Sequence, residues 1–74
     1  MAELTSPMAG KVQEINIKVG QMITEDDELF VIEAMKMEHV LTAPHDGTVI
    51  ELAVQAGGQV SEGAVVMQIQ ASEN

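Results

Sequence analysis

The stretch Glu33-Ala34-Met35-Lys36-Met37, at the middle of the 74-residue chain, decides between two folds. Its residue types are good helix formers. Apolar side chains also recur at helical spacing, at Phe30, Ala34, Met37 and Leu41. The alternative is a pair of strands, residues 28–33 and 37–42, folded about Met35-Lys36. Taken alone the stretch favours the helix, so the choice depends on the rest of the chain.

An internal duplication reverses that preference. When each residue is compared with the residue 37 positions later, ten of the 37 pairs are identical, and no insertion or deletion is needed. The identities fall on turn glycines, prolines and the apolar alternation. The identical residues of the first copy are Leu4, Thr5, Pro7, Gly10, Val12, Glu14, Gly20, Glu25, Ile32 and Ala34. Residues 65–70 are rich in β-formers and are the counterpart of residues 28–33, so both segments are predicted to be strands.

Each copy predicts short strands separated by polar or glycine-containing turns. The expected strands are residues 3–6, 12–17, 22–23, 28–33, 37–42, 48–54, 59–60 and 64–70. Two similar halves must bury their apolar sides against each other, which predicts an all-β fold, a flattened β-barrel or sandwich with internal pseudo-two-fold symmetry. We expect a single domain over residues 1–74, built from half-repeats of about 1–37 and 38–74.

The turn at Met35-Lys36 links the two halves, and its counterpart by symmetry is Ser72-Glu73 near the C-terminus. Lys36 is therefore expected at one end of the barrel and both chain termini at the other. Tight two-residue turns favour Asn-Gly or Asp-Gly, because both central residues have positive φ. A Met-Lys turn breaks this preference, and such local conflicts are expected at functional sites.

The composition excludes several classes of function. Three cations against twelve acidic residues give a net charge of −9, so binding to nucleic acid or to anionic membranes is not expected. No apolar run approaches the length of a membrane span. Without cysteine there is no disulfide framework or thiolate metal site. The chain is expected to be soluble and intracellular, with partners that carry basic patches.

The central stretch resembles the biotin-attachment motif of biotin carboxyl carrier domains. Three further stretches resemble the corresponding parts of this family: Ser6-Pro7-Met8-Ala9-Gly10, Ala43-Pro44-His45-Asp46-Gly47 and residues 57–63. The resemblance covers about residues 4–70. Its Ala-Met-Lys-Met core is specific to biotin carriers, whereas the remainder is shared with lipoyl domains.

This resemblance implies two four-stranded antiparallel sheets with a biotinyl-lysine at the tip of a hairpin. Biotin protein ligase would attach biotin to Lys36 through an amide, with Glu33, Ala34, Met35 and Met37 as its recognition motif. The arm would then swing between a biotin carboxylase, where the ring accepts carboxylate, and a carboxyltransferase, where it delivers it. The chain itself would be a non-catalytic carrier, in the cytoplasm or, if excised from a eukaryotic carboxylase, in the mitochondrial matrix.

One detail concerns the subtype, and another is a departure from the family pattern. Residues 12–23 carry no insertion relative to residues 49–60, whereas carriers of bacterial acetyl-CoA carboxylase have a protruding thumb there. The chain is thus more similar to the carriers of propionyl-, methylcrotonyl- or geranyl-CoA and pyruvate carboxylases and related decarboxylases. The family usually has glycine at the position of Asp26, which copy two keeps as Gly63. We expect a slightly altered surface turn at Asp26.

Two other functions stay open from the sequence. One is a lipoyl carrier of a dehydrogenase complex, and the other is an unmodified barrel that acts as an interaction module. No metal site is expected, because His39 and His45 lack a clear third ligand. No catalytic residue is expected either, because nothing in the sequence positions Ser6, His45 and Asp46 as a triad.

Overall fold

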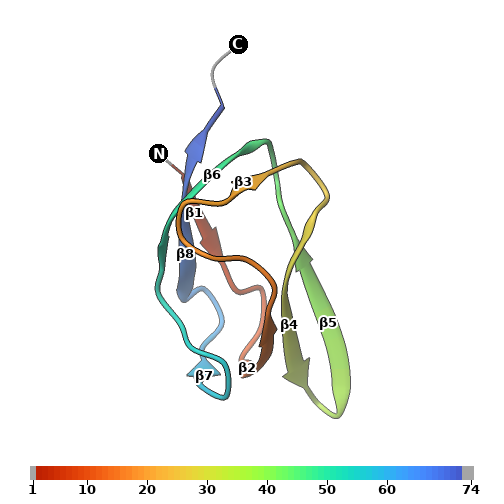
Figure 1. Cartoon of the computed structure of the whole chain (residues 1–74). Helices are drawn as coiled ribbons and strands as arrows, with labels where there is room; N and C mark the ends of the chain where they lie inside the picture. Colours follow the sequence, from red (N-terminus) through yellow and green to blue (C-terminus); the bar gives the residue numbers. More distant parts are fainter. Residues whose placement is uncertain (1, 73–74) are drawn as a thin grey trace.

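The computed structural model describes residues 2–72, and in this range the chain forms eight strands (Figure 1). They are β1 (Ala2–Thr5), β2 (Gly10–Ile15), β3 (Met22–Ile23), β4 (Glu28–Ala34), β5 (Met37–Thr42), β6 (Gly47–Leu52), β7 (Gln59–Val60) and β8 (Val65–Ala71). No helix occurs in this range, so the described part of the chain offers none that could cross a membrane.

The central stretch is a β-hairpin, as its counterpart in the second copy predicts. Phe30 and Ile32 on β4 are fully buried, while Glu33 at the end of the same strand is exposed. As a helix, residues 28–41 could bury the side chains of only one face. As a strand between β2 and β5, β4 buries four consecutive residues. Tertiary burial therefore overrides the local helix propensity.

The eight strands form two four-stranded antiparallel sheets, with strand orders β5-β4-β2-β7 and β1-β8-β6-β3. We call them the tip sheet and the terminal sheet. The register of one repeats in the other after 37 residues: Val12 pairs with Ile32 in the tip sheet, and Val49 pairs with Ile69 in the terminal sheet. Pairings between β3 and β6 match those between β7 and β2 in the same way. The pseudo-two-fold symmetry expected from the sequence is confirmed.

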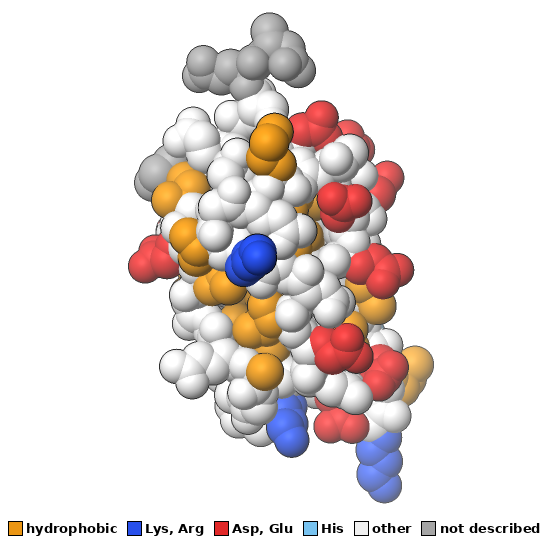
Figure 2. All heavy atoms as spheres, in the orientation of Figure 1, with side chains coloured by type: hydrophobic (Ala, Val, Ile, Leu, Met, Phe, Trp, Pro, Cys, Tyr) orange, Lys and Arg blue, Asp and Glu red, His pale blue; other side chains and the backbone are white. Residues whose placement is uncertain are grey.

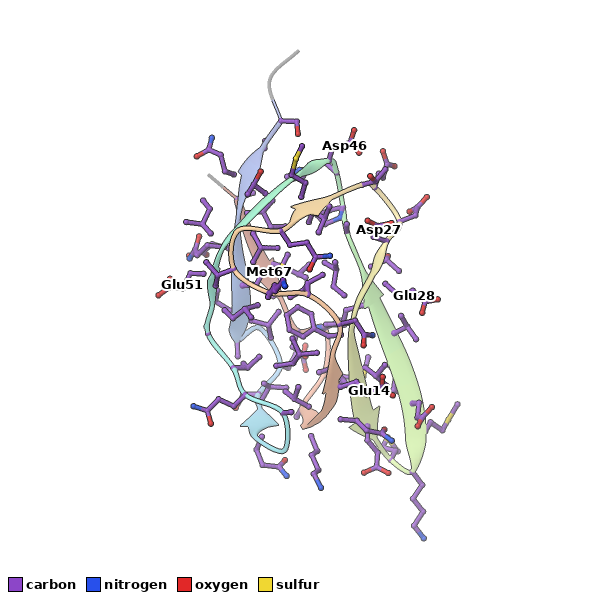
Figure 3. All side chains as sticks on the ribbon, in the orientation of Figure 1. Glu14, Asp27, Glu28, Asp46, Glu51 and Met67 are labelled. Atoms are coloured by element: carbon purple, nitrogen blue, oxygen red, sulfur yellow. The ribbon has the colours of Figure 1, made fainter. Side chains whose placement is uncertain are left out.

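The core lies between the two sheets. Phe30 is its largest member, and Phe30 and Met67 occupy equivalent positions in the two copies and are both fully buried. Met67 lies inside the molecule between the layers (Figure 3). Complete burial of each such side chain contributes about 1.5–3 kcal/mol relative to its exposure. With one aromatic in the chain, aliphatic residues and Met67 fill the space that aromatics take in larger cores.

Two of the expected strands end two residues earlier than the sequence predicted. β2 ends at Ile15, although strand character was expected to residue 17, and β6 ends at Leu52, although it was expected to reach residue 54. A register shift between Val12 and Glu14, repeated between Val49 and Glu51, marks a β-bulge in each strand. A bulge bends its strand, and in each copy only two paired residues follow it before the strand ends: Glu14 and Ile15 in β2, Glu51 and Leu52 in β6.

The turn at Asp26 was expected to be altered, and this expectation is wrong for the backbone. Asp26 has φ 74° and its counterpart Gly63 has φ 84°. The amide of Asp26 donates to the carbonyl oxygen of Ala43 (2.9 Å), as the amide of Gly63 donates to that of Ser6 (2.8 Å). Carboxylates support the turn in copy one: Thr24 N donates to Asp27 Oδ2 at 2.8 Å. Aspartate tolerates the left-handed region better than most residues, which explains why the turn survives.

β1 begins and β8 ends at one pole of the molecule, and the β4–β5 hairpin forms the other (Figure 1). At the first pole the amide of Ser72 donates to the carbonyl oxygen of Asp46 (3.1 Å). Glu73, one half of the expected counterpart of the central turn, lies outside the described residues, as do Met1 and Asn74.

Candidate functional site

Met35 and Lys36 are the two central residues of the turn between β4 and β5. The last strand pair below them joins Ala34 to Met37, so the turn has only two residues. Their φ angles are 53° and 65°, both in the left-handed region. This is the geometry that a right-twisted hairpin demands of a two-residue turn, and residues other than glycine and asparagine adopt it at a cost.

The side chains at this tip point into solvent. Met35 is 93% exposed and Met37 is 62% exposed, which are high values for methionine. Lys36 and Glu33 are also exposed, and Ala34 is half-buried. The tip therefore contributes little to the core, and its residues are available to a partner.

The base of the hairpin, in contrast, is held tightly. Gly10 on β2 lies beside the end of β4. A Cβ atom built on Gly10 would lie 2.5 Å from the carbonyl oxygen of Glu33 and 3.2 Å from Cβ of Ala34. Only glycine allows this approach. The sequence signal for this close contact was the recurrence of Gly10 as Gly47, which makes the equivalent contact with Gln70 in the second copy. The flexible side chain of Lys36 thus extends from a hairpin whose base is closely packed against β2.

Met8, in the loop before β2, is half-buried and packs against the core. Ser6 beneath it is 1% exposed, and its Oγ donates to the carbonyl oxygen of Met8 at 2.6 Å. The hydroxyl of Ser6 therefore holds the loop that leads into β2.

Ser6, His45 and Asp46 do not act on one another as a catalytic triad would. Nδ1 of His45 lies 2.9 Å from the carbonyl oxygen of Asp46, and Asp46 Oδ1 accepts a hydrogen bond from the amide of Glu25 at 2.8 Å. Both contacts fix the turn before β6. Across residues 2–72, the structure contains no group of three or more His, Cys, Asp or Glu side chains that could hold a metal ion.

Comparison with protein families gives one matching model. The model described as "Biotin-requiring enzyme" matches residues 2–69.

Relatives of known function are long carboxylase chains. The chain is 42% identical over 67 residues to the propionyl-CoA carboxylase alpha chain, mitochondrial, of Homo sapiens, a match that covers 90% of this chain and 9% of the relative. It is 39% identical over 66 residues to the methylcrotonoyl-CoA carboxylase subunit alpha, mitochondrial, of Arabidopsis thaliana, covering 89% of this chain and 9% of the relative. The chain thus spans about a tenth of the length of these relatives.

Solved structures lead to the same group of proteins. A single-chain, multi-domain long-chain acyl-CoA carboxylase superposes with a TM-score of 0.91 at 30% identity, over 97% of this chain and 7% of the other. The urea carboxylase of Kluyveromyces lactis superposes with a TM-score of 0.86 at 30% identity, over 93% of this chain and 6% of the other.

Proposed function

The chain belongs to the family of biotin-requiring enzymes, and on that premise we propose that Lys36 is the residue that carries its biotin. It is a biotin carboxyl carrier, which holds biotin covalently and is not itself catalytic. The observation that carries the proposal is the position of Lys36, exposed on a two-residue turn at the pole opposite the first and last described strands.

The residues of the tip fit such a cofactor. An amide to Lys36 requires a primary amine that an enzyme can reach, and this side chain lies in solvent. Biotin, once attached, supplies a ring nitrogen that accepts and releases a carboxyl group. The chain holds the lysine backbone still while the side chain and the attached group swing, which keeps the local concentration of the cofactor high. Acylation removes one of three cations, so the net charge changes from −9 to −10.

Glu33, Ala34, Met35 and Met37 are proposed as the recognition motif for biotin protein ligase. Three of the four are exposed, so a ligase can contact them without unfolding the hairpin. Met35 and Met37 expose long, flexible and polarizable side chains, which adapt well to a partner surface. The fixed base at Gly10 presents these side chains in one arrangement.

The parent enzyme is proposed to be a biotin-dependent carboxylase or decarboxylase of the type without a thumb. The relatives named above act on propionyl-CoA and methylcrotonoyl-CoA, and a pyruvate carboxylase of Caenorhabditis elegans is also similar, with 40% identity over 65 residues. Its partners would be the biotin carboxylase and carboxyltransferase parts of that enzyme, with no role for nucleic acid or membrane. We expect it in the cytoplasm, or in the mitochondrial matrix where the parent enzyme is mitochondrial.

Mass spectrometry of the intact chain after co-expression with biotin protein ligase tests the proposal. We expect one biotin adduct on the unaltered chain and none on Lys36→Arg, which keeps the cation but lacks a primary amine. Lys11→Arg and Lys18→Arg are the matched controls and should retain the adduct. An adduct on the Lys36→Arg chain would contradict the assignment. A lipoyl adduct formed instead of biotin would point to a dehydrogenase complex, and no adduct would point to an unmodified interaction module.

A further inference from the structure

The outer sides of the two sheets can be compared residue by residue, because the pseudo-two-fold symmetry gives each position of one sheet an equivalent in the other. In the tip sheet, Val31 pairs with Val40 and with Glu14, so these three side chains share the side that faces away from the core. Glu33 pairs with Glu38 and Lys11 on the same side. We call this side the acidic face, and its residues are Lys11, Glu14, Glu28, Val31, Glu33, Glu38 and Val40.

The centre of the acidic face is apolar. Val31 is 7% exposed and lies outside the core cluster, and its neighbour Val40 is 46% exposed. The equivalent residues of the terminal sheet are Gln68 and Glu3, and Gln68 Nε2 donates to Glu3 Oε2 at 3.0 Å. A hydrogen-bonded polar pair suits a surface that stays in water, whereas the exposed surface of Val40 gains if something covers it.

Acidic side chains surround this apolar centre. Glu14, Glu28, Glu33 and Glu38 are all exposed, and Lys11 is the face's single cation. The equivalents of Glu28 and Glu33 in the terminal sheet are Val65 and Gln70, which are uncharged. Figure 2 shows Asp and Glu side chains along the flank formed by β4 and β5. Asp27 and Glu28 lie on this flank, on the opposite side of the molecule from Glu51 (Figure 3).

We propose that the acidic face is the docking surface for biotin protein ligase, through a ligase surface that places Lys or Arg side chains around an apolar one. This inference rests on the proposed role of Lys36. The face leads directly to the tip, since the Glu33–Glu38 pair is followed by the Ala34–Met37 pair and then by the turn. A ligase that takes Lys36 into its active site meets this face next.

The physics of encounter favours the ligase over the carboxylase parts as the occupant. In the matched relatives the equivalent region is 9% of one long chain, so a carrier built in this way meets other parts of the same polypeptide at a high effective concentration. The ligase, in contrast, is a separate protein that must be met by diffusion. Complementary charge raises the rate of such encounters and fixes the orientation of the partners.

The test measures kcat/KM for biotin transfer by biotin protein ligase to the full chain, with the carrier as the varied substrate. The face variant is Glu14→Gln/Glu28→Gln. Its matched control is Glu51→Gln/Glu62→Gln, which removes the same charge outside the acidic face: Glu51 on β6 is the direct counterpart of Glu14, and Glu62 lies in the turn between β7 and β8. We expect the face variant to lose about tenfold in kcat/KM at low salt and to approach the unaltered chain at high salt, because screening removes steering. The control should lose less than about twofold.

The apolar centre is tested by a second pair. Val40→Thr should raise KM about threefold at every salt concentration, because the lost contact is apolar. Ile50→Thr on β6, where Ile50 is 37% exposed, should leave KM unchanged. Urea unfolding of all four variants checks that each remains folded.

The outcomes separate this inference from the proposed function. Equal losses in the face variant and its control would show that only net charge matters, and no loss in either would show that the face is not used; both results overturn the docking surface. In both cases a biotin adduct on Lys36 would still support the carrier role. Absence of the adduct from the unaltered chain would overturn the role of Lys36 itself.

Discussion

The tip and the base of the β4–β5 hairpin depart from the usual placement of glycine in opposite ways: the tip lacks glycine where it is favoured, and the base has it where it is disfavoured. At the tip, Met35 and Lys36 have φ of 53° and 65°, where glycine or asparagine is favoured. At the base, Gly10 lies within β2, where glycine costs about 0.5–1 kcal/mol relative to alanine. The base has glycine because no other residue fits beside Glu33. The tip keeps two side chains where the backbone favours glycine or asparagine, which agrees with the role proposed for Lys36 and its neighbours.

The largest effect is expected at the base. Gly10→Ala places a Cβ atom 2.5 Å from the carbonyl oxygen of Glu33, and Gly47→Ala places one 2.5 Å from that of Gln70. Either change must move a strand, which we expect to lower the free energy of unfolding by about 1–3 kcal/mol. Urea unfolding measures it. Gly58→Ala is the control, since its nearest neighbour is 3.1 Å away, and it should cost less. Equal midpoints for all three variants and the unaltered chain would show that the close contact is not rigid.

The next effect has the opposite sign and is expected at the tip. Met35→Asn/Lys36→Gly supplies the turn residues that this geometry favours, so the free energy of unfolding should rise by about 1 kcal/mol. The same variant should carry no biotin. Met35→Ala/Lys36→Ala is the control, because it removes the side chains without easing the backbone and should leave stability nearly unchanged. If both variants had the same urea midpoint, the left-handed turn would not be strained.

The smallest effect is expected at Asp26 and its counterpart Gly63, a positive-φ position that is aspartate in one copy and glycine in the other. Gly63→Asp should cost about 0.5 kcal/mol and Gly63→Ala about 1 kcal/mol, because aspartate tolerates positive φ better than alanine does. Asp26→Gly should change the free energy of unfolding by less than about 0.5 kcal/mol. Thermal and urea unfolding of the three chains measure this ranking. A larger loss for Gly63→Asp than for Gly63→Ala would contradict it.

Most of the fold could be predicted from the sequence, because the duplication supplied a second copy of every ambiguous segment. The helical appearance of residues 28–41 was corrected by the β-rich residues 65–70. The bulges of β2 and β6 could not be located, since an imperfect alternation does not say which residue is extra. The turn at Asp26 was misjudged because its supporting hydrogen bonds come from Asp27 and from Asp46, which is distant in the sequence but adjacent in the fold.

The site was predicted in part. Lys36 was expected on a turn between the halves, and Met-Lys was recognised as a poor pair for turn formation. The structure has that turn, with positive φ at both residues. The acidic face was out of reach, because Val31, Val40 and Glu14 come from three strands and become neighbours only once the register is known. The sequence could show that the chain is acidic but could not show which side carries the charge.

The interleaving of the strands has a consequence for synthesis. Each sheet takes two strands from the first four and two from the last four, and among the described strands only β4 and β5 are both consecutive and paired. β1, the first described strand, pairs with β8, the last described one. A chain still emerging from the ribosome can close the hairpin that bears Lys36, but the terminal sheet stays incomplete until β8 has been made and joins β1 to β6. The inner side of the hairpin is therefore open to aggregation during that interval, even though the hairpin can already have its final shape.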